Sequence, residues 1–135
     1  MANNTLESIF IESNEDSSFT PTVNFDLATG VCSIEGESCL ENAAEFYNTL
    51  IKWFEQYIKQ KEGNIELNLK LLYFNTSSSK CILDMLKILK HYKDSGGMVT
   101  VNWYYRSYDE DQLEEAQDYV AYTKLPMNII PIQDD

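Results

Sequence analysis

Five short polar side chains, Asn75 to Ser79, separate a strongly apolar segment from a helical pattern. Ser and Thr hydroxyls are phosphate acceptors, and at the first turn of a helix the backbone N–H groups and the helix dipole favour a phosphoryl group. The same side chains also cap helices, because their oxygens accept hydrogen bonds from N–H groups that lack a partner within the helix. From the residue types, capping by Thr76 or Ser77 is the commoner use, and a phosphorylation site is the alternative.

Catalytic and metal chemistries find little support in the sequence. The single histidine, His91, follows the hydroxyl run by about four helical turns, too far to serve those hydroxyls as a base. Cys32, Cys39 and Cys81 show no CxxC spacing, which predicts free thiols in a reducing compartment and not zinc ligands. No glycine-rich phosphate loop occurs. We therefore expect no enzymatic activity, no cofactor and no metal.

The composition indicates one domain, residues 1–135, with an acidic surface. The chain has 135 residues, of which 44% are hydrophobic and 13% aromatic, enough for a single core. Asp and Glu number 22 against 10 Lys and Arg, and the formal net charge of -12 opposes binding to nucleic acid or to an anionic membrane. No secretory signal or membrane-spanning run occurs, so we expect a cytoplasmic protein.

Hydrophobic periodicity predicts an α/β domain with a mixed sheet and about three helices. The buried face of a central strand that ends at Phe74 is expected to comprise alternating residues: Leu67, Leu69, Leu71 and Tyr73. Helices are expected at 43–61, from the hydroxyl run to about residue 92, and at 109–124. Further strands are expected at 6–11, within a hairpin at 22–35, at 98–105 and at 127–132. Pro131 implies an edge strand.

Two more local patterns bear on the site. Asn42, with Glu45 three residues later, indicates an N-cap and a capping box at the first helix. Loops at the same strand ends of an α/β sheet cluster together, so Glu37, Ser38, Glu41 and Asn42 are expected beside Thr76. A turn followed by a helix cap is the alternative for these four. Residues 1–5 are expected to fray, and 14–18 to form a solvated turn.

The segment LLYFNTSSSK, residues 71–80, resembles the LLYLNTSS signature of the SiaC family of bacterial regulatory phosphoproteins. Further similar segments follow the same order along the chain: TPTVNFD, GVCSIEGES, EN at 41–42, and VNWYY before an acidic helix. The resemblance covers nearly all of residues 20–132. It implies a single STAS-like domain, similar to anti-sigma-factor antagonists.

The resemblance also implies a function. By the matching motif, Thr76 is phosphorylated by a dedicated threonine kinase and dephosphorylated by a PP2C-type phosphatase. The unmodified form binds an effector, which in the best understood system is a diguanylate cyclase. Cys39 and Leu40 stand where the family usually has an aromatic residue and a proline, and Arg106 where an acid is common, so these positions bear on partner choice. The partner-binding residues implied are Asn75, Ser77, Ser78, Lys80, Glu37, Ser38, Glu41 and Asn42.

A second functional hypothesis is a small-molecule-binding α/β module without phosphorylation. Its pocket would lie at the same strand ends, where ligands bind in open α/β sheets. The sequence leaves the effector, the kinase and the input signal unidentified.

Overall fold

The structure, a computed structural model, describes residues 5–13 and 20–133. The turn expected at 14–18 and residues 1–4 of the expected frayed end lie outside the described residues. The elements are, in chain order, β1 (Ile9–Ile11), β2 (Thr22–Phe25), β3 (Val31–Ser38), α1 (Ala43–Gln60), β4 (Ile65–Phe74), α2 (Thr76–Asp94), β5 (Val99–Arg106), α3 (Glu110–Thr123) and β6 (Asn128–Ile132). The predicted α/β class is confirmed.

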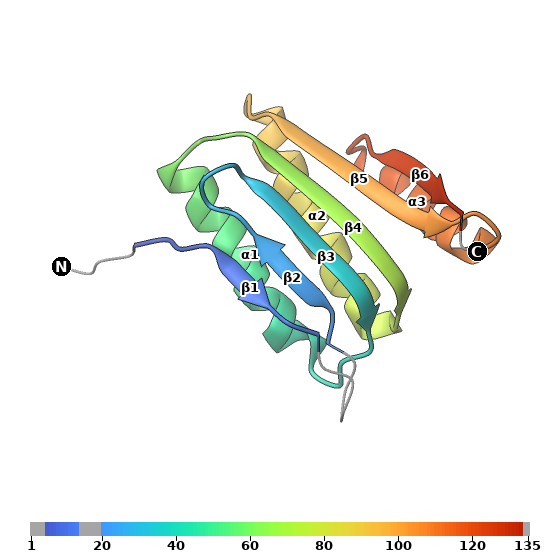
Figure 1. Cartoon of the computed structure of the whole chain (residues 1–135). Helices are drawn as coiled ribbons and strands as arrows, with labels where there is room; N and C mark the ends of the chain where they lie inside the picture. Colours follow the sequence, from blue (N-terminus) through green and yellow to red (C-terminus); the bar gives the residue numbers. More distant parts are fainter. Residues whose placement is uncertain (1–4, 14–19, 134–135) are drawn as a thin grey trace.

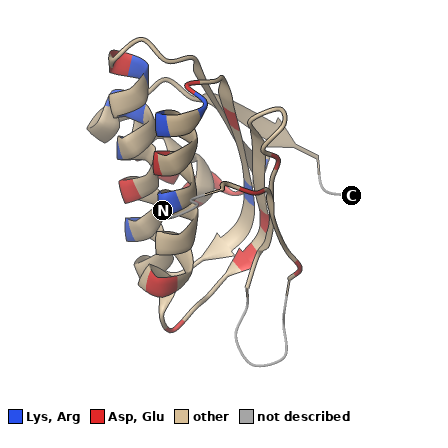
Figure 2. Ribbon diagram, turned by 90° about the vertical axis from the view of Figure 1, so that its left-hand side faces the viewer, with Lys and Arg blue, Asp and Glu red and all other residues tan. Residues whose placement is uncertain are grey.

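The strands form one six-stranded mixed sheet in the order β1-β2-β3-β4-β5-β6. β1, β2 and β3 pair antiparallel, and β3 to β6 pair parallel. The helices cover one face of this sheet and leave the other face open (Figures 1 and 2). β6 is an edge strand, as Pro131 predicted. Because β3, β4 and β5 run in the same direction, the segments that lead into α1, α2 and α3 all leave from one end of the sheet.

The core lies between the sheet and the helices. Its largest fully buried side chains come from both layers: Phe25, Ile34, Ile65, Leu67, Leu69, Leu71 and Trp103 from the strands, and Tyr47, Leu50, Phe54, Ile82 and Met85 from the helices. Burying one such side chain contributes about 1.5–3 kcal/mol. This packing fixes α1 and α2 side by side and holds their first turns in place.

A β-bulge in β4 overturns one expectation about the core. Gly36 pairs with Leu71 but Glu37 pairs with Tyr73, so Leu72 is an extra residue in the ladder. The extra residue reverses the alternation of the side chains beyond it. Tyr73, predicted to be buried, is therefore 55% exposed, and Phe74 packs edge-on against Trp103 with 5.8 Å between ring centroids.

Candidate functional site

The hydroxyl run forms the first turn of α2, and Asn75 caps it. The Asn75 Oδ1 accepts a hydrogen bond from the Ser78 N–H at 2.9 Å, so capping by Thr76 or Ser77 was the wrong expectation. Asn75 is the better cap because its side chain also reaches the loop before α1. Its Nδ2 donates to the Leu40 carbonyl at 3.2 Å, and its backbone N–H donates to the Ser38 carbonyl at 3.1 Å.

A buried chain of hydroxyl groups joins the end of β3 to α1 and α2. The Ser78 Oγ donates to the Ser38 carbonyl at 3.0 Å, which leaves Ser78 Oγ as the acceptor for Ser38 Oγ at 2.8 Å. Ser38 Oγ then accepts from the Tyr47 hydroxyl, also at 2.8 Å. Each hydroxyl donates once, so the chain is fully satisfied. Burial is the largest influence on Tyr47 and raises its pKa to about 12, although the Ser38 hydrogen bond opposes the shift.

Burial of this chain corrects the expected roles of two residues. Ser38 and Ser78 are 0% exposed, so neither side chain lies on a surface that a partner could touch. They instead hold the GES segment of β3 against the first turn of α2. The GES segment and the hydroxyl run, which the sequence predicted to lie side by side, are thus joined by hydrogen bonds in the protein interior.

Ser79 is hydrogen-bonded to two residues of α3. Its Oγ donates to Glu115 Oε2 at 2.7 Å, and the Tyr119 hydroxyl donates to the Ser79 carbonyl at 2.9 Å. Burial, first, and then the nearby Glu115 carboxylate raise the Tyr119 pKa, so the phenol stays protonated and keeps donating. This cluster fixes α3 to the first turn of α2.

Thr76 and Ser77 are the hydroxyls of the run that remain accessible. Both side chains are exposed, whereas Ser78 is buried and Ser79 is half-buried and hydrogen-bonded. Thr76 is the first residue of α2 and Ser77 the second. A modifying enzyme can therefore reach these two side chains from solvent without unfolding of the protein.

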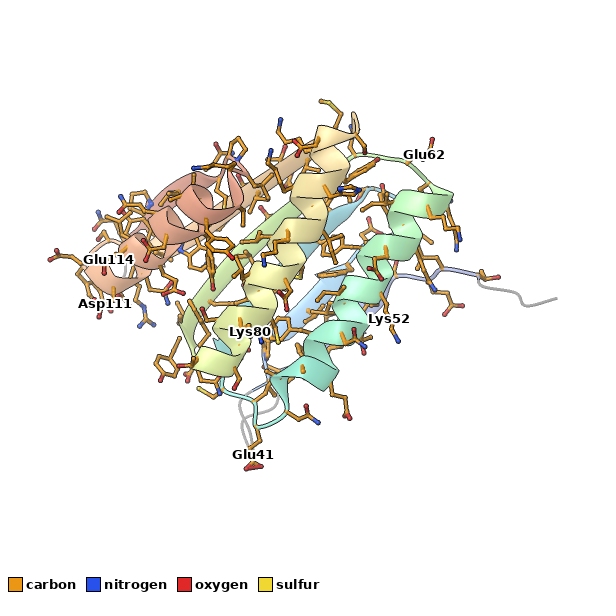
Figure 3. The ribbon with its side chains drawn as sticks, turned by 180° about the vertical axis from the view of Figure 1, so that it is seen from behind. Glu41, Lys52, Glu62, Lys80, Asp111 and Glu114 are labelled. Atoms are coloured by element: carbon orange, nitrogen blue, oxygen red, sulfur yellow. The ribbon has the colours of Figure 1, made fainter. Side chains whose placement is uncertain are left out.

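The other expected site residues occupy different positions around this turn. Glu41 and Asn42 are exposed in the segment between β3 and α1, and the Asn42 Oδ1 caps α1 by accepting from the Glu45 N–H at 3.3 Å. The predicted N-cap is therefore confirmed. Lys80 is exposed one turn after Thr76, and Figure 3 shows Lys80 and Glu41 at the same end of the helical layer.

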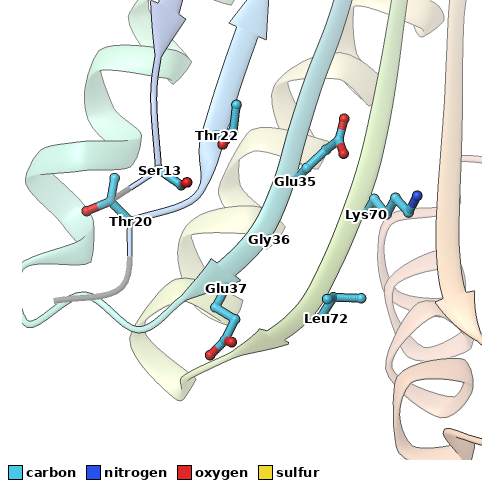
Figure 4. A pocket seen from close by; sticks show the side chains of 8 residues that line it. All are labelled: Ser13, Thr20, Thr22, Glu35, Gly36, Glu37, Lys70 and Leu72. Carbon is cyan, nitrogen blue, oxygen red and sulfur yellow. The ribbon is translucent and has the colours of Figure 1, made fainter. Parts of the chain in front are cut away.

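Glu37 faces the open side of the sheet, where it lines a shallow pocket (Figure 4). The pocket has a volume of about 400 Å³ and is lined by Ser13, Thr20, Thr22, Glu35, Gly36, Glu37, Lys70 and Leu72. Thr76 is not among the lining residues. A pocket therefore exists beside the strand ends, but it opens on the opposite side of the sheet from α2.

Tyr73 is the exposed side chain that sequence reasoning missed. It stands three residues before Thr76 and pairs with Glu37 across the β3–β4 ladder. Large exposed aromatic side chains are frequent anchors of protein interfaces. The two consecutive leucines before it, Leu71 and Leu72, break strict alternation and could have indicated the bulge.

The remaining sequence candidates lie apart from this turn. His91 is exposed in the last turn of α2, at the opposite end of the helix from Thr76. Within residues 5–13 and 20–133, no group of three His, Cys, Asp or Glu side chains is placed to hold a metal ion. None of the described helices is long and apolar enough to cross a membrane.

The protein is a small α/β domain in which the helices cover one face of a mixed sheet. Two exposed hydroxyl groups, those of Thr76 and Ser77, lie at the start of α2. The family model described as the SiaC family regulatory phosphoprotein matches residues 14–132. The chain belongs to this family. It is also 33% identical over 110 residues to an uncharacterised protein of Pseudomonas aeruginosa (strain UCBPP-PA14), with 82% of this chain and 87% of that protein covered.

Solved structures of Pseudomonas aeruginosa SiaC share the fold. The apo-SiaC crystal structure is similar with a TM-score of 0.80 and 30% identity, covering 92% of this chain and 98% of that chain. A chain in the crystal structure of the diguanylate cyclase SiaD in complex with its activator SiaC is similar with a TM-score of 0.84 and 30% identity, covering 92% and 99%. The protein is thus a regulatory phosphoprotein by family.

Proposed function

We propose that this protein is a non-enzymatic, cytoplasmic partner-switching regulator whose switch is the Thr76 hydroxyl. A threonine kinase phosphorylates Thr76, a PP2C-type phosphatase removes the phosphate, and the unmodified form binds and regulates an effector. The effector we propose is a diguanylate cyclase, because the Pseudomonas aeruginosa SiaC in the related complex is the activator of one. The cytoplasmic location is proposed together with these partners, because kinases and cyclases use nucleoside triphosphates.

The observation that carries this proposal is that Asn75, Ser78 and Ser79 are engaged in hydrogen bonds within the fold, whereas the Thr76 side chain is exposed. Asn75 supplies the cap, Ser78 is consumed by the buried hydroxyl chain, and Ser79 is held by α3. Thr76 is needed for none of these contacts and is exposed. Its side chain is therefore available for modification at little cost to the fold.

A phosphate at this position would change the surface without unfolding it. It adds about -1.5 to -2 charges at the first turn of a helix, where negative charge is favoured by the N-terminal end of the dipole. α2 has no acidic residue in its first turn, so the modification introduces a charge that this turn lacks. An effector that desolvates the turn on docking would then have to bury or displace a dianion.

We place the docking surface around this turn. It comprises the exposed Thr76, Ser77 and Lys80 on α2, the exposed Glu41 and Asn42, and the partly exposed Asn75. At the end of β4 it continues to Tyr73 and the partly exposed Glu37, which pair with each other and face the open side of the sheet. Ser38 and Ser78 support it from within. Tyr73 is proposed as the apolar anchor, and Thr76 as the point where charge controls contact.

The first test is to map the phosphate. The purified protein is incubated with its cognate threonine kinase and ATP and analysed by peptide mass spectrometry. We expect one phosphate on Thr76, no phosphate on the Thr76→Val variant, and normal modification of the matched control Ser77→Ala. Incubation with a PP2C-type phosphatase and its metal should remove the group.

The second test separates charge from folding. Asp is well tolerated at the start of a helix, so Thr76→Asp should fold normally while it weakens effector binding. A phosphate mapped to Ser77 or elsewhere, or unchanged binding by Thr76→Asp, would contradict the proposal.

A further inference from the structure

Lys80 is placed to meet a group attached to Thr76. Both residues lie on α2 four positions apart, both are exposed, and side chains at this spacing are neighbours with about 5–6 Å between Cβ atoms. The Cα–Cβ bond of a helical residue also tilts toward the helix N-terminus, which directs Lys80 back toward Thr76. The same helix already contains one pair at this spacing, because Lys90 Nζ lies 2.7 Å from Asp94 Oδ1.

In the described part of the chain, Lys80 forms no ion pair and no side-chain hydrogen bond with another residue. The acids around it are poor competitors for a phosphate. Asp84 is four positions further along α2 but forms no ion pair with Lys80, although Lys90 and Asp94 pair in the same order on this helix. Glu115 on α3 already accepts from Ser79, and Glu41 lies on the separate segment before α1. A phosphate at Thr76 would precede Lys80 and carry more charge than a carboxylate.

We propose that phosphorylated Thr76 pairs with the Lys80 ammonium along the surface of α2. Modification then changes the docking surface twice: it adds a dianion and withdraws the one cation of the first two turns of α2 from any partner. This inference rests on the proposed phosphorylation of Thr76. It assigns Lys80 a regulatory role in addition to its place on the docking surface, since the effector would lose a cationic contact when the switch is set.

The inference can be tested without the kinase. Phosphothreonine is installed at position 76 by genetic code expansion in the full chain, and the second ionisation of the phosphate is followed by ³¹P NMR in about 0.1 M salt, where the Debye length is about 10 Å. Three proteins are compared: the otherwise unchanged chain, Lys80→Met and Lys87→Met. Lys87 is the matched control, because it is an exposed lysine on the same helix but about 16 Å along the axis from Thr76.

A neighbouring ammonium stabilises the phosphate dianion, so its removal should raise the second pKa of the phosphate. We expect Lys80→Met to raise it by about 0.2–0.4 unit, the shift that corresponds to an i,i+4 ion pair, and Lys87→Met to leave it unchanged. Identical titrations for the unchanged chain and Lys80→Met would overturn the pairing, and equal shifts in both variants would show a general field instead. Failure of a kinase to modify Thr76 would contradict the proposed function without altering this titration, so the two failures can be told apart.

Discussion

Replacing Ser78 by Ala should destabilise the domain although it lies in a motif that the sequence assigns to signalling. Ser78 Oγ accepts the hydrogen bond from Ser38 Oγ at 2.8 Å in a region with no exposure to solvent. In the Ser78→Ala variant, the Ser38 hydroxyl therefore has no acceptor for the hydrogen bond that it donates. The hydrogen bond from Ser78 Oγ to the Ser38 carbonyl is lost as well, although the Asn75 N–H still donates to that carbonyl.

The expected loss follows from one orphaned buried donor. Leaving a buried hydroxyl unsatisfied costs about 1–3 kcal/mol. For a domain of this length, about 1 kcal/mol corresponds to about 3–4 °C in Tm. Ser78→Ala should therefore lower Tm by about 3–12 °C, whereas Ser77→Ala, at an exposed neighbour, should change the free energy of unfolding by no more than about 0.5 kcal/mol.

Urea unfolding measures both variants, and a double-mutant cycle identifies the cause. In a Ser38→Ala background the Ser38 donor is absent, and the Tyr47 hydroxyl has lost its acceptor whether or not Ser78 is replaced. Adding Ser78→Ala should then cost clearly less than it does alone, with a coupling free energy of about 0.5–3 kcal/mol. The reasoning is refuted if Ser78→Ala is as stable as Ser77→Ala, or if the two substitutions add without coupling.

Three further outcomes are expected. Tyr73→Ala should weaken effector binding by about tenfold or more without loss of stability, as measured by titration calorimetry, whereas Tyr122→Ala, at a more exposed tyrosine on α3, should not. Asn75→Ala should lower the free energy of unfolding by about 1 kcal/mol, and Asn75→Asp by less because it keeps the capping oxygen, as measured by urea unfolding. Because the folded-state pKa of Tyr47 is raised to about 12, above the ordinary value near 10, its contribution to stability is complete below pH 10 and is lost as the pH rises toward 12. Unfolding compared at pH 8 and pH 11 should therefore show a smaller alkaline loss for Tyr47→Phe than for the unchanged chain.

The order of the elements could be predicted from the sequence because it rests on local patterns. Alternation defined β4 up to Leu71, Asn42 marked the start of α1, and Pro131 marked an edge strand. Each of these signals depends on a few neighbouring residues and on general stereochemistry.

What the sequence missed depends on how strands and motifs meet in space. The bulge at Leu72 exists only in the pairing of β4 with β3, so alternation misassigned Tyr73. The burial of Ser38 and Ser78 arises because segments 40 residues apart bond to each other, which no local pattern records. Choosing the cap between Asn75 and its neighbours likewise required the contact from Asn75 to Leu40.

The most direct test of the central claim compares effector binding by two forms of the same protein. A diguanylate cyclase of the source organism is titrated calorimetrically with the unmodified chain and with the chain that carries phosphothreonine at position 76. We predict that the unmodified chain binds and that the phosphate weakens binding by about tenfold or more, which corresponds to about 1.4 kcal/mol. Equal affinity of the two forms would contradict the assignment of Thr76 as the switch.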